Sequence, residues 1–181
     1  MGTIFTIGHS TRTLDEFLAL LRAHGIRAVV DVRRFPGSRR HPRFSREALA
    51  ASLRAAGIDY LHEEALGGRR PVAAGSPNGA WRNRAFQGYA DHMATAAFGR
   101  ALARLESAAV ARPTAILCAE AVPWRCHRNL IADALTARGT QVLHILSEAH
   151  ARPHTLHPSA RVGTDGTLTY PGTDAQLAML E

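Results

Sequence analysis

The sequence contains no lysine, so its surplus of positive charge comes from arginine alone. The absence of lysine excludes a Schiff-base lysine, a lysine general base and the lysine of a Walker-type phosphate loop. The 22 basic residues outnumber the 15 acidic residues, which gives a formal net charge of +7. A surplus of this size favours partners that carry phosphate, either a phosphate-bearing small molecule or a nucleic acid.

Cysteines, long apolar runs and leader-like segments are also scarce. The chain of 181 residues has two cysteines, and no charged stretch precedes an apolar one near its start. No apolar run approaches the length that spans a membrane. We therefore expect a cytoplasmic protein with reduced thiols and no membrane association, folded as one domain over residues 1–181.

Strand-like and helix-like segments alternate along the chain. Short apolar runs predict strands at 4–8, 28–32, 59–62, 114–117 and 141–146. Apolar residues at helical spacing predict helices at 14–24, 45–56, 86–110 and 126–138. Their alternation predicts an α/β fold, with a mostly parallel sheet flanked by helices in Rossmann-like layers. A long irregular loop is expected at 67–85, and a C-terminal extension at 151–181 with a hairpin turn at Asp165 and Gly166.

The segment 114–135 carries both cysteines, with Cys118 at the end of a predicted strand and Cys126 at the start of a predicted helix. The N–H groups at a helix start favour a thiolate or a bound oxyanion. With His127 and Arg128 beside it, Cys126 is the best candidate for a reactive group. Alternatively, both cysteines pack as small apolar residues, an interpretation that fits Cys118 better because it ends an apolar run.

The cysteine pair has two further potential roles, as ligands of a structural zinc ion and as a redox pair. The two residues lie further apart in sequence than the C-x2-4-C ligand pair of structural zinc sites, so such a site is not favoured. Redox pairing stays open, because a strand end and the next helix start can be neighbours in space.

Polar residues that follow parallel strands converge on the carboxyl edge of the sheet, where ligands bind. Five candidate catalytic residues are expected there: His9, Asp31, Cys118, Glu120 and Cys126. His9 and Glu120 could transfer a proton, and Cys126 could act as a nucleophile or redox thiol. The candidate substrate-binding or anion-binding residues are Ser10, Arg33, Ser38, Arg39, Arg43, Gly67, Gly68, His127 and Arg128.

Two of these candidates have simpler alternatives. Asp31 could form an ion pair with Arg33 at the strand end, rather than face a substrate. Ser10 could cap the helix that follows it, rather than bind phosphate.

The loop 33–44 is rich in arginine and also holds His41, Phe35 and Phe44. Arginine forks suit phosphate groups, and aromatic rings can stack on bases. The alternative is a solvated turn whose phenylalanines anchor it to the core. Arg69, Arg70 and the segment 81–84 continue the same basic and aromatic character.

Several short motifs together resemble the family known as domain of unknown function 488. They are T-I-G-H-S at 6–10, D-V-R at 31–33, P-G-S at 36–38 followed by R-F-S at 43–45, L-G-G at 66–68, C-A-E at 118–120, C-H-R at 126–128 and V-L-H-I at 142–145. The element from C-A-E to C-H-R is the most specific of these. The resemblance implies a compact cytoplasmic α/β domain and supplies no catalytic assignment.

Three hypotheses follow. The first is an enzyme that acts on a nucleotide or nucleic acid, in which arginines hold the phosphate and Cys126 with Glu120 or His9 performs the chemistry. The second is a noncatalytic nucleic-acid-binding module that uses the loop 33–44 and the segment around Trp81. The third and weaker one is a metal site, drawn from His9, Cys118, Cys126, His127 or the tail histidines His144, His150, His154 and His157.

Overall fold

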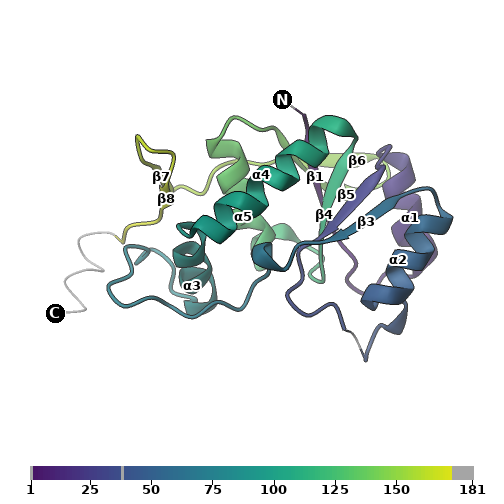
Figure 1. Ribbon diagram of the computed structural model, residues 1–181, viewed down its shortest axis with the longest axis horizontal. Coiled ribbons are helices and arrows are strands. Elements are labelled where there is room, and N and C mark those ends of the chain that lie inside the picture. Colours follow the sequence, from purple (N-terminus) through teal and green to yellow (C-terminus); the bar gives the residue numbers. More distant parts are fainter. Residues whose placement is uncertain (1, 38, 173–181) are drawn as a thin grey trace.

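The computed structural model describes residues 2–37 and 39–172, which form a six-stranded sheet between two layers of helices (Figure 1). The strands are β1 (Ile4–Gly8), β2 (Ala28–Asp31), β3 (Asp59–His62), β4 (Thr114–Cys118), β5 (Val142–Ser147) and β6 (His150–Pro153). They are ordered β3-β2-β4-β1-β5-β6; the first five are parallel, and β6 is antiparallel to β5. The predicted α/β fold with a mostly parallel sheet is confirmed.

Helices cover both faces of this sheet. They are α1 (Leu14–Ala23), α2 (Arg46–Ala55), α3 (Arg84–Met93), α4 (Ala96–Ala111) and α5 (Arg128–Ala137). Figure 1 shows α1 and α2 on one face, with α4 and α5 on the other. Successive strand residues point to opposite faces. On β4, Ala115 and Leu117 therefore join the core under α1 and α2, whereas Ile116 and Cys118 join the core under α3, α4 and α5.

Glycines with positive φ angles and a capping residue mark several of the predicted ends of helices and strands. Gly25 and Gly57 follow α1 and α2 with φ angles of 65° and 73°, the left-handed conformation expected of a glycine that ends a helix. Ser45 occupies the N-cap position of α2, although its side chain makes no capping hydrogen bond. The two strands β7 (Arg161–Val162) and β8 (Leu168–Thr169) form the predicted C-terminal hairpin, with Gly166 at a φ of 80° in its turn.

Capping explains two differences from the predicted helices. Thr13 caps α1, because its hydroxyl accepts a hydrogen bond from the Glu16 N–H and the Glu16 carboxylate accepts one from the Thr13 N–H. Ser10 is therefore not the cap. The single helix predicted at 86–110 is two helices, because Thr95 accepts a hydrogen bond from the Phe98 N–H and starts α4 anew.

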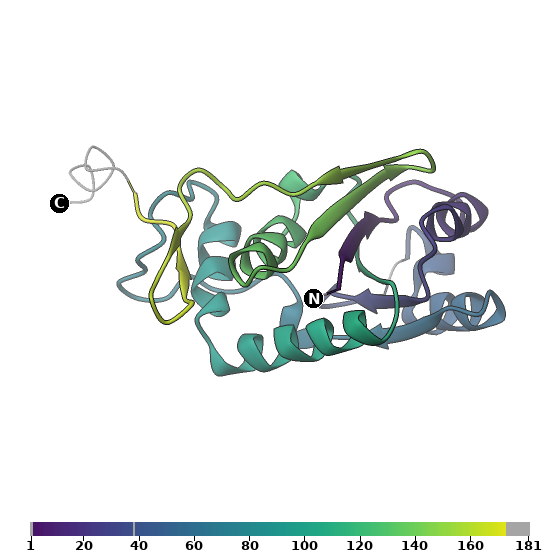
Figure 2. The ribbon, with the colours of Figure 1, turned by 90° about the horizontal axis from the view of Figure 1, so that it is seen from above.

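Other differences lie in the second half of the chain. A 3-10 turn at Pro123–Arg125 precedes α5, which begins at Arg128 rather than at Cys126. The strand β6 was not predicted, because it is short, mostly exposed and contains a proline. The stretch between Leu66 and α3 has neither helix nor strand, and α3 begins at Arg84. Figure 2 shows the C-terminal hairpin beside α3, at the end of the molecule remote from α1. Within the described part of the chain, no helix has the length and apolar character needed to cross a membrane.

Candidate active site

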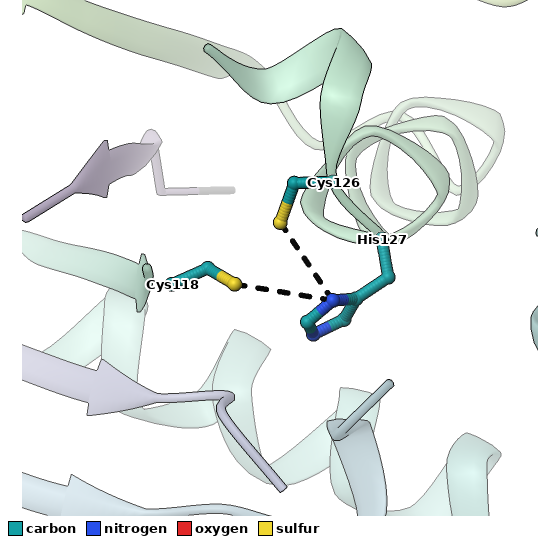
Figure 3. Close-up of side chains that lie close together, drawn as sticks. All are labelled: Cys118, Cys126 and His127. Atoms are coloured by element: carbon teal, nitrogen blue, oxygen red, sulfur yellow. Dashed lines mark hydrogen bonds between the residues drawn. The ribbon is translucent and has the colours of Figure 1, made fainter. Parts of the chain in front are cut away.

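Two thiols and one imidazole meet where β4 ends and α5 begins. Cys118 is the last residue of β4, and Cys126 and His127 directly precede α5. The Nδ1 atom of His127 lies 3.6 Å from the Cys126 Sγ and 4.0 Å from the Cys118 Sγ. In Figure 3 both sulfur atoms point toward the imidazole ring. The loop 119–125 thus brings together three of the residues that the sequence singled out, and we call them the thiol–imidazole cluster.

The imidazole of His127 is held in one orientation. Its Nε2 atom lies 2.9 Å from the carbonyl oxygen of Val32. Because a carbonyl only accepts, Nε2 carries the hydrogen, and in the neutral ring the lone pair of Nδ1 faces the two sulfur atoms. Gly68 lies against the face of the ring, where a Cβ atom would be 3.0 Å from Nδ1 and 3.4 Å from both carbon atoms bonded to it. The glycine therefore lets its loop lie against the imidazole.

The two thiols have opposite pKa shifts. Burial alone would raise the pKa of Cys126, but the hydrogen bond from Cys118 and the charge and backbone N–H of Arg128 outweigh burial and lower this pKa to about 7. The Arg128 N–H lies 3.5 Å from the Cys126 Sγ. The pKa of Cys118 is raised, because its thiol donates to Cys126 and is itself buried. Cys126 is therefore the sulfur that ionises first, at a pH near neutral, whereas Cys118 keeps its proton.

The thiol–imidazole cluster lines a pocket of about 510 Å³ at the carboxyl edge of the sheet. Four arginines also line this pocket: Arg33, Arg34, Arg69 and Arg125. Glu120 is the one acidic residue among the residues that form its walls. Phe35 stands at the same pocket with its side chain 63% exposed, and the Arg34 guanidinium lies 5.4 Å from the centre of its ring.

Asp31 and Arg33 form a buried ion pair, the simpler of the two roles considered for them. The Arg33 Nε donates to Asp31 Oδ1 at 2.9 Å, and Arg33 Nη2 pairs with Oδ2. The Tyr60 hydroxyl also donates to Asp31 Oδ2, at 2.7 Å, and burial together with this carboxylate raises the pKa of Tyr60. Both carboxylate oxygens of Asp31 are thus engaged within the protein, so Asp31 acts by holding Arg33.

The motif residues His9 and Ser10 lie outside the pocket walls. His9 is buried and stacks on Phe44, with the ring centres 4.5 Å apart. Burial and the charge of Arg33 lower the pKa of His9 to about 4, so the ring is neutral at neutral pH. Ser10 has a φ of 46°, and its N–H donates to the Ala119 carbonyl oxygen, which joins the loop after β1 to the loop after β4.

Of the remaining candidates, two are buried behind the pocket and two are arginines outside its walls. Gly67 is buried against Arg34, and the buried Arg128 guanidinium donates to the Glu120 carbonyl oxygen at 2.6 Å without lining the pocket. Arg43 lines a separate hollow beside Arg12 and Arg40, and Arg39 is exposed away from the pocket walls. The candidate Ser38 lies outside the described residues.

Sequence reasoning did not select Arg34, Arg69, Arg125 or Tyr89 as site residues. A signal existed for Arg34, because neighbours in extended backbone point in opposite directions, and Arg33 turns inward to Asp31. Arg125 is adjacent to Cys126. Tyr89 is found only through the fold: its buried ring centre lies 5.0 Å from that of His127, and its hydroxyl donates to the Leu66 carbonyl oxygen.

A second polar cluster lies deeper in the protein and includes two of the tail histidines. The Thr6 hydroxyl lies 2.8 Å from His144 Nδ1, and His144 Nε2 lies 2.9 Å from His154 Nδ1. His154 Nε2 lies 2.7 Å from Asp133 Oδ1, and the Tyr170 hydroxyl donates to Asp133 Oδ2 at 2.8 Å. We call these five residues the buried histidine relay. Its ring nitrogens bond to protein groups, although His144 and His154 also line a second pocket of about 310 Å³.

The other tail histidines do not join a metal-ligand group. His150 is exposed on β6, and the ring centre of His157 lies 4.6 Å from that of Trp81. Among the described residues, the only His, Cys, Asp and Glu side chains grouped closely enough to hold a metal ion are Cys118, Cys126 and His127.

Comparison with known proteins agrees with the resemblance of the motifs. The family model described as domain of unknown function DUF488 matches residues 13–135. Searches of curated proteins and of solved structures find no match to the chain.

Proposed function

This chain belongs to the DUF488 family, whose description names no activity, and from its site we propose an enzyme that acts on a phosphate-bearing substrate, a nucleotide or nucleic acid. The substrate would lie in the pocket above the thiol–imidazole cluster. The observation that carries this proposal is the charge of the pocket, whose walls hold four arginines and one carboxylate. Guanidinium groups at a pocket favour a bound phosphate through paired, charge-assisted hydrogen bonds.

The arginines differ in how much of their donor capacity is already used. Asp31 occupies one side of the Arg33 guanidinium, and the Phe44 carbonyl oxygen accepts from its Nη1 at 2.8 Å. Arg34 donates from Nη1 to the Arg69 carbonyl oxygen, and its buried Nε has no hydrogen-bond partner among the described residues. Arg34 lines the pocket with less of its donor capacity used than Arg33, so its guanidinium can still pair with a phosphate oxygen. Arg34 is therefore the expected centre of phosphate binding, with the exposed Arg125 beside the sulfur atoms.

Phe35 supports a nucleotide rather than inorganic phosphate as the ligand. Its large apolar side chain is 63% exposed at the pocket, beside the guanidinium of Arg34. An exposed ring next to a phosphate-binding arginine is the arrangement that stacks a base while its phosphate is held.

The reactive groups would be the thiol–imidazole cluster and Glu120. The sulfur atoms lie on the pocket wall, where a bound phosphate ester would meet them. Glu120 is exposed at the same wall and would transfer a proton to or from a leaving group. His9, which is buried outside the pocket walls, would support Arg33 rather than exchange a proton with the substrate.

Binding of AMP and of a short single-stranded oligonucleotide, measured by isothermal titration calorimetry, tests the phosphate site. Arg34→Ala and Arg125→Ala are each expected to weaken binding about tenfold or more, the effect of losing one charge-assisted hydrogen bond of roughly 1.5–3 kcal/mol. Arg22→Ala is the matched control, because Arg22 is an exposed arginine in the last turn of α1. Equal losses in all three variants, or no binding by the wild-type chain, would refute the phosphate site.

Turnover separates an enzyme from a binding module. Incubation with a panel of nucleotides and oligonucleotides, followed by chromatography, is expected to show a product with the wild-type chain and none with Glu120→Gln, which should still bind AMP. Binding without turnover, falling steeply with salt and lost on substitution of Arg39 or Arg43, would instead support the noncatalytic nucleic-acid-binding module.

A further inference from the structure

We propose that Cys118, Cys126 and His127 bind one zinc ion, with a fourth coordination position open to the pocket. The proposal deepens the proposed function, on which it rests for the substrate, because the ion would lie in the same pocket as the phosphate. It makes the cluster a catalytic metal centre rather than a pair of free thiols.

The spacing of the three donor atoms fits a zinc ion. Zinc bonds of about 2.3 Å to sulfur and about 2.0 Å to nitrogen place a sulfur and a nitrogen ligand roughly 3.5 Å apart and two sulfur ligands roughly 3.8 Å apart. The observed separations from His127 Nδ1 are 3.6 Å to the Cys126 Sγ and 4.0 Å to the Cys118 Sγ, and all three donor atoms lie within 4.8 Å of one another. The two sulfur–nitrogen separations are therefore within about half an ångström of those in a tetrahedral zinc site.

The surroundings of His127 are those of a metal ligand. Its Nε2–H donates to the Val32 carbonyl oxygen at 2.9 Å, which directs the lone pair of Nδ1 toward the two sulfur atoms. A backbone carbonyl that fixes the far nitrogen in this way is a common outer partner of metal-bound histidine. The absence of a side chain at Gly68 lets the ring keep this orientation, since a Cβ there would press on its face at Nδ1.

The charges of the cluster also favour a cation with two positive charges. Two thiolates neutralise zinc, so the loaded centre would be uncharged beside the buried Arg33 and Arg128. The Arg128 N–H already approaches the Cys126 Sγ at 3.5 Å, as a donor to a metal-bound thiolate would. Zinc binding would release the thiol protons to solvent and involves no change of oxidation state.

The open position indicates the chemistry. Three protein ligands and one free position are typical of catalytic zinc, whereas structural zinc has four protein ligands. The free position would face the arginine-lined pocket, where zinc could polarise a phosphate oxygen or a water molecule for hydrolysis. The structure thus points to hydrolysis of a phosphate ester, with Glu120 on the same wall as the proton-transfer group.

Metal analysis of the full-length chain tests this inference. After equilibration with zinc and gel filtration, we expect one zinc per chain by mass spectrometry. With cobalt in place of zinc, we expect the visible bands of tetrahedral cobalt and a thiolate-to-cobalt charge-transfer band. Cys118→Ser, Cys126→Ser and His127→Ala should each lower cobalt affinity at least tenfold. His92→Ala is the matched control, because His92 Nε2 also bonds a backbone carbonyl, that of Ala65, at 2.7 Å, but without a nearby thiol.

A second measurement needs no variant. Addition of a strong chelator to the zinc-loaded wild-type chain should make two thiols reactive toward Ellman's reagent at the rate at which zinc leaves. Absence of stoichiometric zinc, or two thiols equally reactive before and after chelation, would overturn the metal site. AMP binding by a chain that takes up no zinc would leave the phosphate site standing, and zinc uptake without AMP binding would refute the phosphate site alone.

Discussion

The thiol–imidazole cluster and the buried histidine relay both involve α5, and both place imidazole rings in the interior. They differ in the partners of their polar atoms. In the relay, the nitrogens of His144 and His154 and both oxygens of Asp133 have protein partners. In the cluster, Nδ1 and two sulfur atoms face one another at a pocket wall. The relay therefore links its polar atoms into one continuous chain of bonds although two of its residues border a pocket, whereas the cluster groups three donor atoms closely enough to share one ion.

The sharpest test of this difference is the free energy of unfolding after one substitution in each cluster. Asp133→Ala leaves the His154 Nε2–H, the Tyr170 hydroxyl and the His157 N–H without their acceptor. We expect a loss of about 3–5 kcal/mol, the sum of several unsatisfied buried donors. Cys118→Ser in the metal-free chain should cost about 1 kcal/mol or less. Urea unfolding followed by circular dichroism measures the free energy of unfolding of both variants. Equal losses would show that the two clusters contribute alike to stability.

The relay should also control how stability depends on pH. Burial, followed by the charges of His154 and Arg128, lowers the pKa of His144 to about 3, against 6.5 for the ordinary side chain. Between these values the unfolded chain binds a proton that the folded chain does not. The contribution of neutral His144 to the free energy of unfolding is therefore complete above pH 6.5. It falls by about 1.4 kcal/mol per pH unit as the pH drops toward 3.

Urea unfolding at several pH values checks this dependence. The variant His144→Gln should have a shallower slope than the wild type, by about 1.4 kcal/mol per pH unit between about pH 4 and pH 6. His9, with a pKa lowered to about 4 by burial and Arg33, keeps a similar slope in both chains. His150→Gln serves as the control, because His150 is exposed. Identical slopes for His144→Gln and His150→Gln would show that the relay does not exclude the proton.

The smallest expected effect comes from Gly68→Ala, which should change ligand binding more than stability. The added Cβ would lie 3.0 Å from His127 Nδ1, so the ring must move by a few tenths of an ångström. We expect cobalt binding to weaken about two- to fivefold, or roughly 0.5–1 kcal/mol, with unfolding changed by less than that amount. Gly99→Ala is the control, since nothing lies within 4 Å of its added Cβ. Unchanged cobalt binding in Gly68→Ala would show that the His127 imidazole accommodates the added Cβ without losing its binding geometry.

The sequence predicted the fold well because the strands are continuous apolar runs and because glycines mark helix ends. It also placed Cys118 at a strand end, where it lies, and Cys126 at a helix start, whereas Cys126 follows a 3-10 turn two residues before α5. Their separation along the chain argued against a zinc site, but the turn at Pro123–Arg125 folds the intervening loop back, and distance in space no longer follows distance in sequence.

Other features depend on contacts that no local pattern encodes. The buried histidine relay joins Thr6 to Tyr170 through residues of β5, α5 and the segment after β6. The roles of neighbouring arginines were likewise hidden, because Arg33 turns toward Asp31 while Arg34 lines the pocket. Sequence alone gives the order of such residues but not the side on which each one lies.

The buried histidine relay bears on how far the chain can be truncated from its C-terminal end. Every residue of the pocket wall lies between Arg33 and His127, inside the family match of residues 13–135. A fragment that ended at residue 135 would thus retain every residue of the pocket wall, yet it would lack His154 and Tyr170, which bond to Asp133 on α5, and His144, which bonds to His154. The family match therefore ends before β5 and β6, and residues beyond it hold the helix that Cys126 and His127 precede.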